Sequence, residues 1–236
     1  MTLSSTTAPA PTVSRHVTLR GLRFHYRDGG NPAGPTVLVL HGLMGHAREW
    51  DTFSAALTPT YRVMALNQRG HGESDWADEY NVATMASDVA AFLDETGLGR
   101  VHLVGHSMGG QVASVCAAER PGLVDRLVVI DIGPESLDTE FAAMLPAGLE
   151  AMAQASYATV DEAVAEWQAG DPLAREDLLR HYVEHCLIAR PDGRLVWRFD
   201  ARGLASYPAG ATSAQLWAAV DRIVAPTLVV RGEHSH

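Results

Sequence analysis

The stretch that most constrains the fold is residues 105–110, Gly-His-Ser-Met-Gly-Gly, a Gly-x-Ser-x-Gly motif near the middle of the chain. It follows an apolar run, residues 101–104, and precedes a helix-like run, residues 111–120. Strand, motif and helix together form the context of a nucleophile elbow, in which a tight turn holds the serine in strained backbone angles with its hydroxyl exposed. The motif therefore predicts that Ser107 is a nucleophile.

The rest of the chain supports this context from residue 36 onward, because apolar runs suited to strands buried on both faces alternate with helix-like runs. The expected strands are 36–40, 61–66, 101–104 and 127–130, and the expected helices are 49–57, 82–95 and 111–120. Residues 16–19 and 22–26 read as a hairpin before them. This pattern predicts an α/β fold, with a mostly parallel sheet and helices on both faces.

The alternation stops after residue 134 and resumes only near the C-terminus. Helix-like stretches without buried strands fill the interval, and a helix and a strand at 226–230 follow. We therefore expect an α/β core made of residues 14–133 and 213–236, interrupted by a helical lid at 134–212. Residues 1–13 are rich in Ser, Thr, Ala and Pro, which predicts a disordered tail.

Charge and composition exclude several classes of function. The chain has 28 acidic and 18 basic residues and no basic stripe, which argues against a nucleic acid or an anionic membrane as partner. No stretch has the length of a transmembrane helix or the pattern of a signal peptide, so a cytoplasmic location is expected. Cys116 and Cys186 are expected to be buried free thiols, and no metal or cofactor motif accompanies them.

Three motifs now stand in order: His-Gly-Leu at residues 41–43, Arg-Gly-His-Gly at residues 69–72 and the Ser107 motif. Each follows an expected strand. This ordered combination resembles the α/β-hydrolase fold superfamily, in its small single-domain esterase-like branch. The resemblance covers nearly the whole chain after the tail.

The resemblance implies a role for individual residues. Ser107 would be the nucleophile, and the backbone N–H groups of Leu43 and Met108 would form the oxyanion hole. The supporting residues would be His41, Gly42, Gly105 and Gly109. Relatives usually carry aspartate where this chain has Asn67, which predicts a weaker charge contact with Arg69.

Two carboxylates compete for the role of the triad acid. Relatives often carry this acid after the strand that corresponds to residues 226–230, where Glu233 is the candidate. Other relatives carry it after the preceding strand, where Asp131 stands, at the carboxyl end at which active groups gather in such sheets. We favour Asp131 and keep Glu233 as the alternative.

The catalytic histidine of this family follows one further strand, and the sequence contains no such strand or histidine. His234 and His236 lie too early in the chain, so neither is the expected base. We therefore expect a truncated form of an active enzyme, with an inactive hydrolase-like fold as the alternative. The missing strand would leave residues 227–230 as an exposed apolar edge, which predicts reduced solubility or a dimer through that edge.

The expected function is that of a serine hydrolase, acting through an acyl-enzyme on Ser107. The partner would be a small-molecule acyl substrate such as a carboxylic ester, and no cofactor or metal is expected. A carbon–carbon bond hydrolase, a lactonase, a thioesterase and a perhydrolase use the same kind of site and remain alternatives. The expected lid would select the substrate, and it carries no motif that identifies one.

Overall fold

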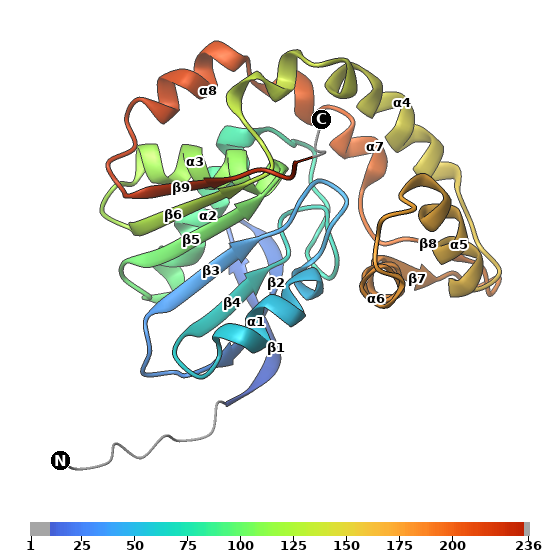
Figure 1. Ribbon diagram of the computed structural model, residues 1–236, viewed down its shortest axis with the longest axis horizontal. Helices are drawn as coiled ribbons and strands as arrows, with labels where there is room; N and C mark the ends of the chain where they lie inside the picture. The colour runs from blue at the N-terminus through green and yellow to red at the C-terminus, as the bar shows by residue number, and fades with distance from the viewer. Residues whose placement is uncertain (1–9, 234–236) are drawn as a thin grey trace.

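The computed structural model describes residues 10–233, and its centre is a seven-stranded sheet with the strand order β1-β2-β4-β3-β5-β6-β9 (Figure 1). The strands are β1 (Ala10–Leu19), β2 (Leu22–Gly30), β3 (Thr36–Leu40), β4 (Arg62–Leu66), β5 (Val101–His106), β6 (Val124–Ile130) and β9 (Thr227–Val230). Strands β1, β2 and β4 pair antiparallel, and all other pairs in this sheet are parallel. The predicted α/β class with a mostly parallel sheet is confirmed.

Strand β1 corrects one detail of the sequence prediction. Residues 10–13, expected to end a disordered tail, are part of β1, where Ala10 is opposite Gly30 and Val13 is opposite Asp28. The partner strand β2 fixes these residues, and a tail composition does not reveal such a partner. Residues 1–9 lie outside the described part of the chain.

Helices cover the two faces of the sheet unequally. Helices α2 (Val82–Thr96), α3 (Met108–Glu119) and α8 (Ser213–Val220) lie on one face, where the larger apolar core includes Leu38, Met64 and Leu103. Helix η1 (Ala47–Trp50) and helix α1 (Asp51–Leu57) lie on the other, over a smaller core that includes Val39 and Val104. Along β3, Val37 and Val39 reach the smaller core and Leu38 and Leu40 reach the larger one, which is why residues 37–40 are all apolar.

The segment between β6 and α8 forms a separate layer above the carboxyl ends of the strands, at the upper right of Figure 1. Its elements are η2 (Pro134–Asp138), α4 (Glu140–Gln154), α5 (Val160–Gly170), α6 (Glu176–Cys186), β7 (Leu187–Ala189), β8 (Leu195–Trp197), α7 (Ala201–Leu204) and η3 (Tyr207–Gly210). Strands β7 and β8 form a small antiparallel hairpin within the segment that we expected to be a helical lid. We call this layer, residues 134–212, the lid.

Strand β9 forms one edge of the sheet. It pairs with β6, and among residues 10–233 no strand lies on its other side. Leu228, Val229 and Val230 are 58%, 64% and 42% exposed. Unpaired backbone groups beside exposed apolar side chains are a template for strand pairing.

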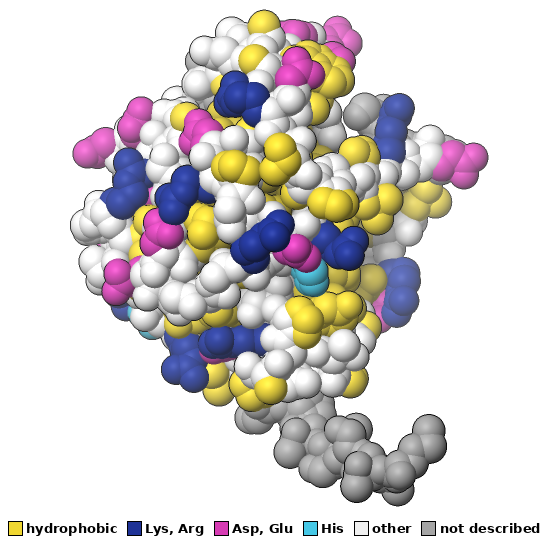
Figure 2. All heavy atoms as spheres, turned by 90° about the vertical axis from the view of Figure 1, so that its left-hand side faces the viewer, with side chains coloured by type: hydrophobic (Ala, Val, Ile, Leu, Met, Phe, Trp, Pro, Cys, Tyr) yellow, Lys and Arg dark blue, Asp and Glu magenta, His cyan; other side chains and the backbone are white. Residues whose placement is uncertain are grey.

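Three further observations concern the described residues as a whole. Cys116 and Cys186 are free and buried, as predicted. No helix among residues 10–233 is long and apolar enough to cross a membrane. On the face shown in Figure 2, arginine and acidic side chains are interspersed and apolar side chains form small groups between them.

Candidate active site

Ser107 lies in a strained turn between β5 and α3. Its backbone angles, φ 50° and ψ −123°, are unusual for any residue with a side chain. Its amide N–H donates to the carbonyl of Ile130 at 2.9 Å, which ties the turn to the neighbouring strand. A Cβ atom on Gly105 would lie 2.2 Å from the carbonyl oxygen of Gly109, so strand and helix can pass this closely only without side chains there.

The helix that follows Ser107 sets the direction of the N–H of Met108, the first of the two expected oxyanion donors. The carbonyl of Ser107 accepts from the N–H groups of Gly110 at 2.7 Å and Gln111 at 3.3 Å, so it points along α3. Because a trans peptide is planar, the N–H of Met108 points the opposite way, out of the helix N-terminus. Among residues 10–233 this N–H donates no hydrogen bond, so it is open to a ligand.

The N–H of Leu43, the second expected oxyanion donor, is oriented by the same peptide geometry. The carbonyl of Gly42 accepts from Nδ1 of His41 at 2.8 Å and from the N–H of Gly45 at 3.0 Å, so the N–H of Leu43 points away from both. Nε2 of His41 accepts from the N–H of Gln68 at 3.0 Å, which places the ring proton on Nδ1. Burial lowers the pKa of His41 well below its usual value, so the neutral ring fixes this peptide.

Two side chains from elsewhere in the chain hold the next carbonyls of the oxyanion loop, residues 41–45. Nε2 of His71 donates to the carbonyl of Leu43. The hydroxyl of Tyr182, on the lid helix α6, donates to the carbonyl of Met44 at 2.8 Å. Tyr182 lies 138 residues from Met44, so no local signal in the sequence identifies it as a support of this loop.

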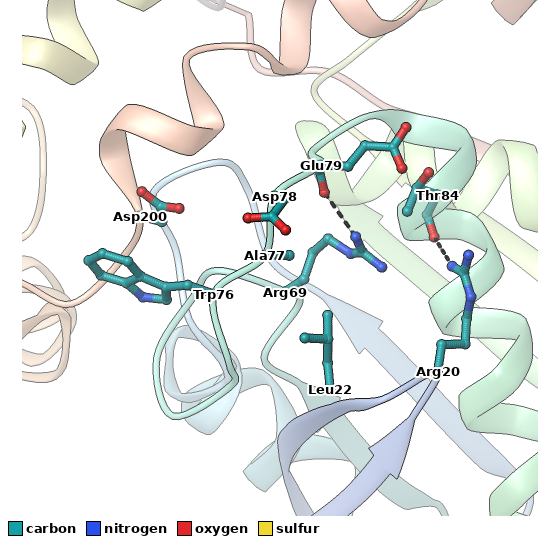
Figure 3. A pocket seen from close by; sticks show the side chains of 9 residues that line it. All are labelled: Arg20, Leu22, Arg69, Trp76, Ala77, Asp78, Glu79, Thr84 and Asp200. Carbon is teal, nitrogen blue, oxygen red and sulfur yellow. Dashed lines mark hydrogen bonds between the residues drawn. The ribbon is translucent and has the colours of Figure 1, made fainter.

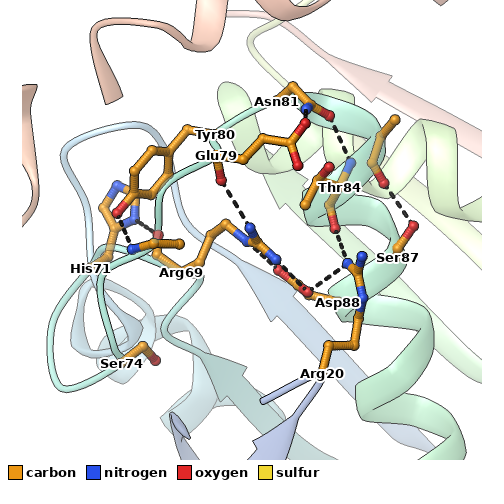
Figure 4. A network of polar contacts seen from close by, with 12 residues as sticks. Arg20, Arg69, His71, Ser74, Glu79, Tyr80, Asn81, Thr84, Ser87 and Asp88 are labelled. Carbon is orange, nitrogen blue, oxygen red and sulfur yellow. Dashed lines mark hydrogen bonds and ion pairs between the residues drawn. The ribbon is translucent and has the colours of Figure 1, made fainter. Parts of the chain in front are cut away.

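The loop that carries His71 is anchored to α2 by a buried ion pair, drawn in Figure 4. Arg69 donates to the two carboxylate oxygens of Asp88 at 2.5 and 2.8 Å, and Arg20 reaches the same carboxylate at 3.0 Å. We expected a weakened contact of Arg69 because Asn67 replaces an acid. Instead, Asp88 supplies the charge, and Asn67 accepts a hydrogen bond from the N–H of Ala47 at 2.6 Å.

A cavity of about 410 Å³ opens in front of Ser107, between the oxyanion loop and the lid. Its apolar wall comes mostly from the lid and includes Leu137, Leu145, Trp167 and Leu179. Three polar side chains of the lining are connected by a series of hydrogen bonds. Tyr207 donates to Gln111 at 2.8 Å, Gln111 to Ser136 at 2.9 Å, and Ser136 to the carbonyl of Gly133 at 2.7 Å.

Glu49 is a residue of the cavity wall that the sequence did not single out. Its side chain is 16% exposed, and Oε1 lies 4.0 Å from Nδ1 of His106. Burial raises the pKa of its carboxyl to about 8, against the opposing effect of the backbone groups of His46 and Gly42. His106 also lines the cavity, and its ring packs close to Gly42.

The two candidate acids lie near one another at the carboxyl ends of β6 and β9. Asp131 follows Ile130, whose carbonyl binds the amide of Ser107. Its carboxylate accepts from the N–H of Gly232 at 3.3 Å, and its charge favours protonation of His106. Glu233 is exposed, one residue further along. Asp131 is thus the candidate beside the elbow, although it does not line the cavity.

The structure places no histidine of residues 10–233 in the position expected of the catalytic base. Ser107 forms no side-chain hydrogen bond with any histidine of residues 10–233, and His234 and His236 lie outside that range. Within the same range, no group of three or more His, Cys, Asp or Glu side chains is placed to hold a metal ion. The described part of the site therefore comprises Ser107 in a strained turn, the N–H groups of Leu43 and Met108, and a cavity in front of them.

A second hollow, of about 570 Å³, lies beside the loop that follows Arg69 and shares no lining residue with the cavity at Ser107 (Figure 3). Both arginines that line it already donate hydrogen bonds to backbone carbonyls. Arg69 donates to the carbonyl of Glu79 at 2.9 Å, and Arg20 to that of Thr84 at 3.1 Å. This hollow contains no nucleophile that resembles Ser107.

Comparison with known proteins defines the class to which this fold and site belong. The family model described as the alpha/beta hydrolase fold matches residues 35–236. The chain therefore belongs to the α/β-hydrolase family, as the ordered motifs predicted.

Individual relatives are similar over part or most of the chain. An uncharacterised protein of Mycobacterium tuberculosis is 36% identical over 148 residues, which is 61% of this chain and 43% of that protein. The lipase LipV of the same organism is 33% identical over 179 residues, 75% of this chain and 67% of LipV. A solved α/β hydrolase of Novosphingobium aromaticivorans superposes with a TM-score of 0.79 at 29% identity, covering 95% of this chain and 82% of that structure. The chain thus spans less than half of the first of these relatives.

Proposed function

We propose that this protein is a serine hydrolase that cleaves a carboxylic ester through an acyl-enzyme on Ser107. The observation that carries the proposal is the position of Ser107 in a strained turn at the cavity, beside the N–H groups of Leu43 and Met108, which donate no hydrogen bond within residues 10–233. Two preorganised donors stabilise a developing oxyanion by several kcal/mol. The similarity to the lipase LipV supports ester chemistry.

The steps follow from the geometry. The oxygen of Ser107 attacks the ester carbonyl, and the resulting oxyanion is bound by the N–H groups of Leu43 and Met108. The alkoxide leaves with a proton, and water then releases the acyl group. The proton of Ser107 must pass to a base, and turnover requires this base from outside residues 10–233. We propose that Asp131, with Glu233 as the alternative, orients that base.

The lining of the cavity also indicates the chemical character of the substrate. Most of its wall is apolar, and none of the arginines of the chain lines it. A substrate with an apolar acyl chain of moderate size would fit this wall, whereas a carboxylate would find no cationic partner. Lactones, thioesters, peracids and carbon–carbon bond substrates would use the same nucleophile, and no feature of the cavity favours one of them over an ester. The partner remains a small molecule, without a cofactor.

Labelling with a fluorophosphonate probe tests the nucleophile. We expect covalent labelling of the wild-type protein and its loss in Ser107→Ala, because the probe reacts with activated serines held beside an oxyanion hole. Ser114→Ala is the matched control, since Ser114 lies about two turns further along α3 and donates to the carbonyl of Gly110. Labelling should persist in this control and be read by mass spectrometry.

Turnover is measured separately, with p-nitrophenyl esters of increasing chain length. Labelled protein that releases no p-nitrophenol beyond one equivalent would indicate a competent nucleophile without a complete triad. Folded protein that is neither labelled nor active would contradict the proposed function and leave an inactive hydrolase-like binding fold.

A further inference from the structure

We propose that the cavity selects esters that carry an ammonium group, and that Glu49 is the residue that binds this group. The inference rests on the proposed function, because it assigns the charged recognition group of the same cavity. It goes beyond that function in naming the substrate class and the residue responsible.

The position of Glu49 gives it access to a substrate held at Ser107. It stands in η1, directly after the oxyanion loop, and its Oε1 atom lies 4.0 Å from the ring of His106, the residue before the nucleophile. Gly45 makes room for this carboxyl, because a Cβ atom there would lie 2.2 Å from Oε2. The carboxyl therefore occupies a place in the wall that the loop leaves open for it.

The charges of the cavity are of one sign. Among the described residues that line it, the two carboxylates are Glu49 and, at the exposed rim, Asp171. No arginine lines the cavity, and the chain contains no lysine. A buried carboxylate is stable when it is paired with a cation. The ring nearest to Glu49 is that of His106, at 4.0 Å, and burial lowers the pKa of this histidine, so the ring is neutral at pH 7 and supplies no charge. A ligand that brings an ammonium group would complete the pair.

Aromatic side chains that line the same cavity favour this type of ligand. Trp167, Tyr182 and Tyr207 line the cavity together with Glu49. The faces of aromatic rings attract cations, and quaternary ammonium ligands are recognised in this way. A neutral apolar ester would also contact these rings. The charge of Glu49 is therefore the feature that would favour an ester with an ammonium group over a neutral one.

Binding of a permanent cation should strengthen as the pH rises through about 8, the pKa to which burial raises Glu49. Below that pH the empty site holds a neutral carboxyl, and the ligand must first displace its proton. The other titratable groups that face Glu49 do not change charge between pH 7 and 9. Burial lowers the pKa of the histidines and raises that of the tyrosine and cysteine among them; they are His41, His46, His106, Tyr182 and Cys186.

The test compares choline with its uncharged carbon isostere, 3,3-dimethylbutan-1-ol. Each compound is titrated as a protector of Ser107 against a fluorophosphonate probe, and choline binding is also measured by calorimetry. At pH 8.5 we expect choline to protect at a concentration about 10-fold or more below that of the isostere. This advantage should shrink about fivefold or more at pH 6.5.

Three variants test whether Glu49 is the residue that gives choline its advantage over the isostere. Glu49→Gln should abolish the advantage of choline and its pH dependence while the isostere protects as before. Glu119→Gln, the same change at an exposed position of α3 outside the cavity, should behave like the wild type. Asp171→Asn, at the rim, should alter the advantage by less than about threefold if Glu49 is the partner.

The possible results separate the two proposals. Labelling of Ser107 without any advantage of choline, or an advantage that survives in Glu49→Gln, would overturn the role of Glu49 and leave the serine hydrolase intact. Absence of labelling in folded protein would contradict the proposed function. Calorimetric binding of choline that depends on Glu49 would then still support the ammonium site, and its absence would overturn it.

Discussion

The direction of single peptide groups determines what this site can do. The N–H groups of Leu43 and Met108 face a ligand because the carbonyls on the other side of the same peptide planes are occupied, one by His41 and one by α3. No side chain of the site has to move to leave these two N–H groups open to the proposed oxyanion. Preorganised donors of this kind account for much of the rate enhancement in acyl transfer.

Substitution of Tyr182 tests whether a single hydrogen bond to the oxyanion loop affects the reactivity of Ser107. Tyr182→Phe removes the hydrogen bond to the carbonyl of Met44, so we expect the rate of Ser107 labelling to fall about three- to tenfold. The free energy of unfolding should fall by only about 1 kcal/mol, the usual contribution of one hydrogen bond. Rates are measured under pseudo-first-order conditions and stability by urea unfolding.

Tyr157→Phe is the control for this variant. Its hydroxyl donates to Glu166 at 3.1 Å within the lid and does not touch the oxyanion loop. A comparable loss of stability with an unchanged labelling rate is expected. If both variants slow labelling equally, Tyr182 acts through general stability and not through the loop.

At the scale of elements, the site depends on loops that are fixed to helices. The loop after β4 carries Gln68 and His71, which support the oxyanion loop, and Arg69 ties it to Asp88 on α2. Both members of this pair are nearly buried, with 6% and 3% of their side chains exposed. Removing one partner would leave the other charge without compensation.

Asp88→Asn should therefore lower the free energy of unfolding by about 3–5 kcal/mol. The measurement is chemical denaturation followed by circular dichroism at neutral pH. The matched control is Asp94→Asn on the same helix, because Asp94 pairs with Arg120 at 2.9 Å on the surface. We expect this control to change stability by less than about 1 kcal/mol, and similar losses in both variants would contradict the argument.

At the scale of the whole molecule, the sheet presents β9 as an apolar edge. A second copy can extend the sheet by pairing with this strand, so we propose concentration-dependent association. Val229→Lys should reduce it about tenfold or more, because charges on an edge strand disfavour pairing. Sedimentation velocity over a range of concentrations is the measurement.

Leu173→Lys is the control that shows whether association depends on pairing of β9 or on exposed apolar side chains in general. Leu173 is 84% exposed but lies in a turn of the lid, outside any strand. Its substitution should leave association unchanged. A wild-type protein that stays monomeric at all concentrations, or equal effects of both variants, would rule out pairing through β9.

The sequence by itself determined the features that depend on neighbours along the chain. The strained turn at Ser107 needs glycines at fixed offsets, and residues 41–43 follow their strand directly, so local pattern and steric argument were sufficient to place them. The family and the α/β fold followed from the order of these motifs, and the comparisons confirmed both.

Only the tertiary structure decided which residues from distant segments complete the site. It gave Arg69 the partner Asp88, placed residues 10–13 in β1 and brought Tyr182 to the oxyanion loop. It also put Glu49 into a cavity without a cation. The physical reason is that burial and long-range hydrogen bonds depend on what packs against a residue in space, and the linear pattern around that residue does not carry this information.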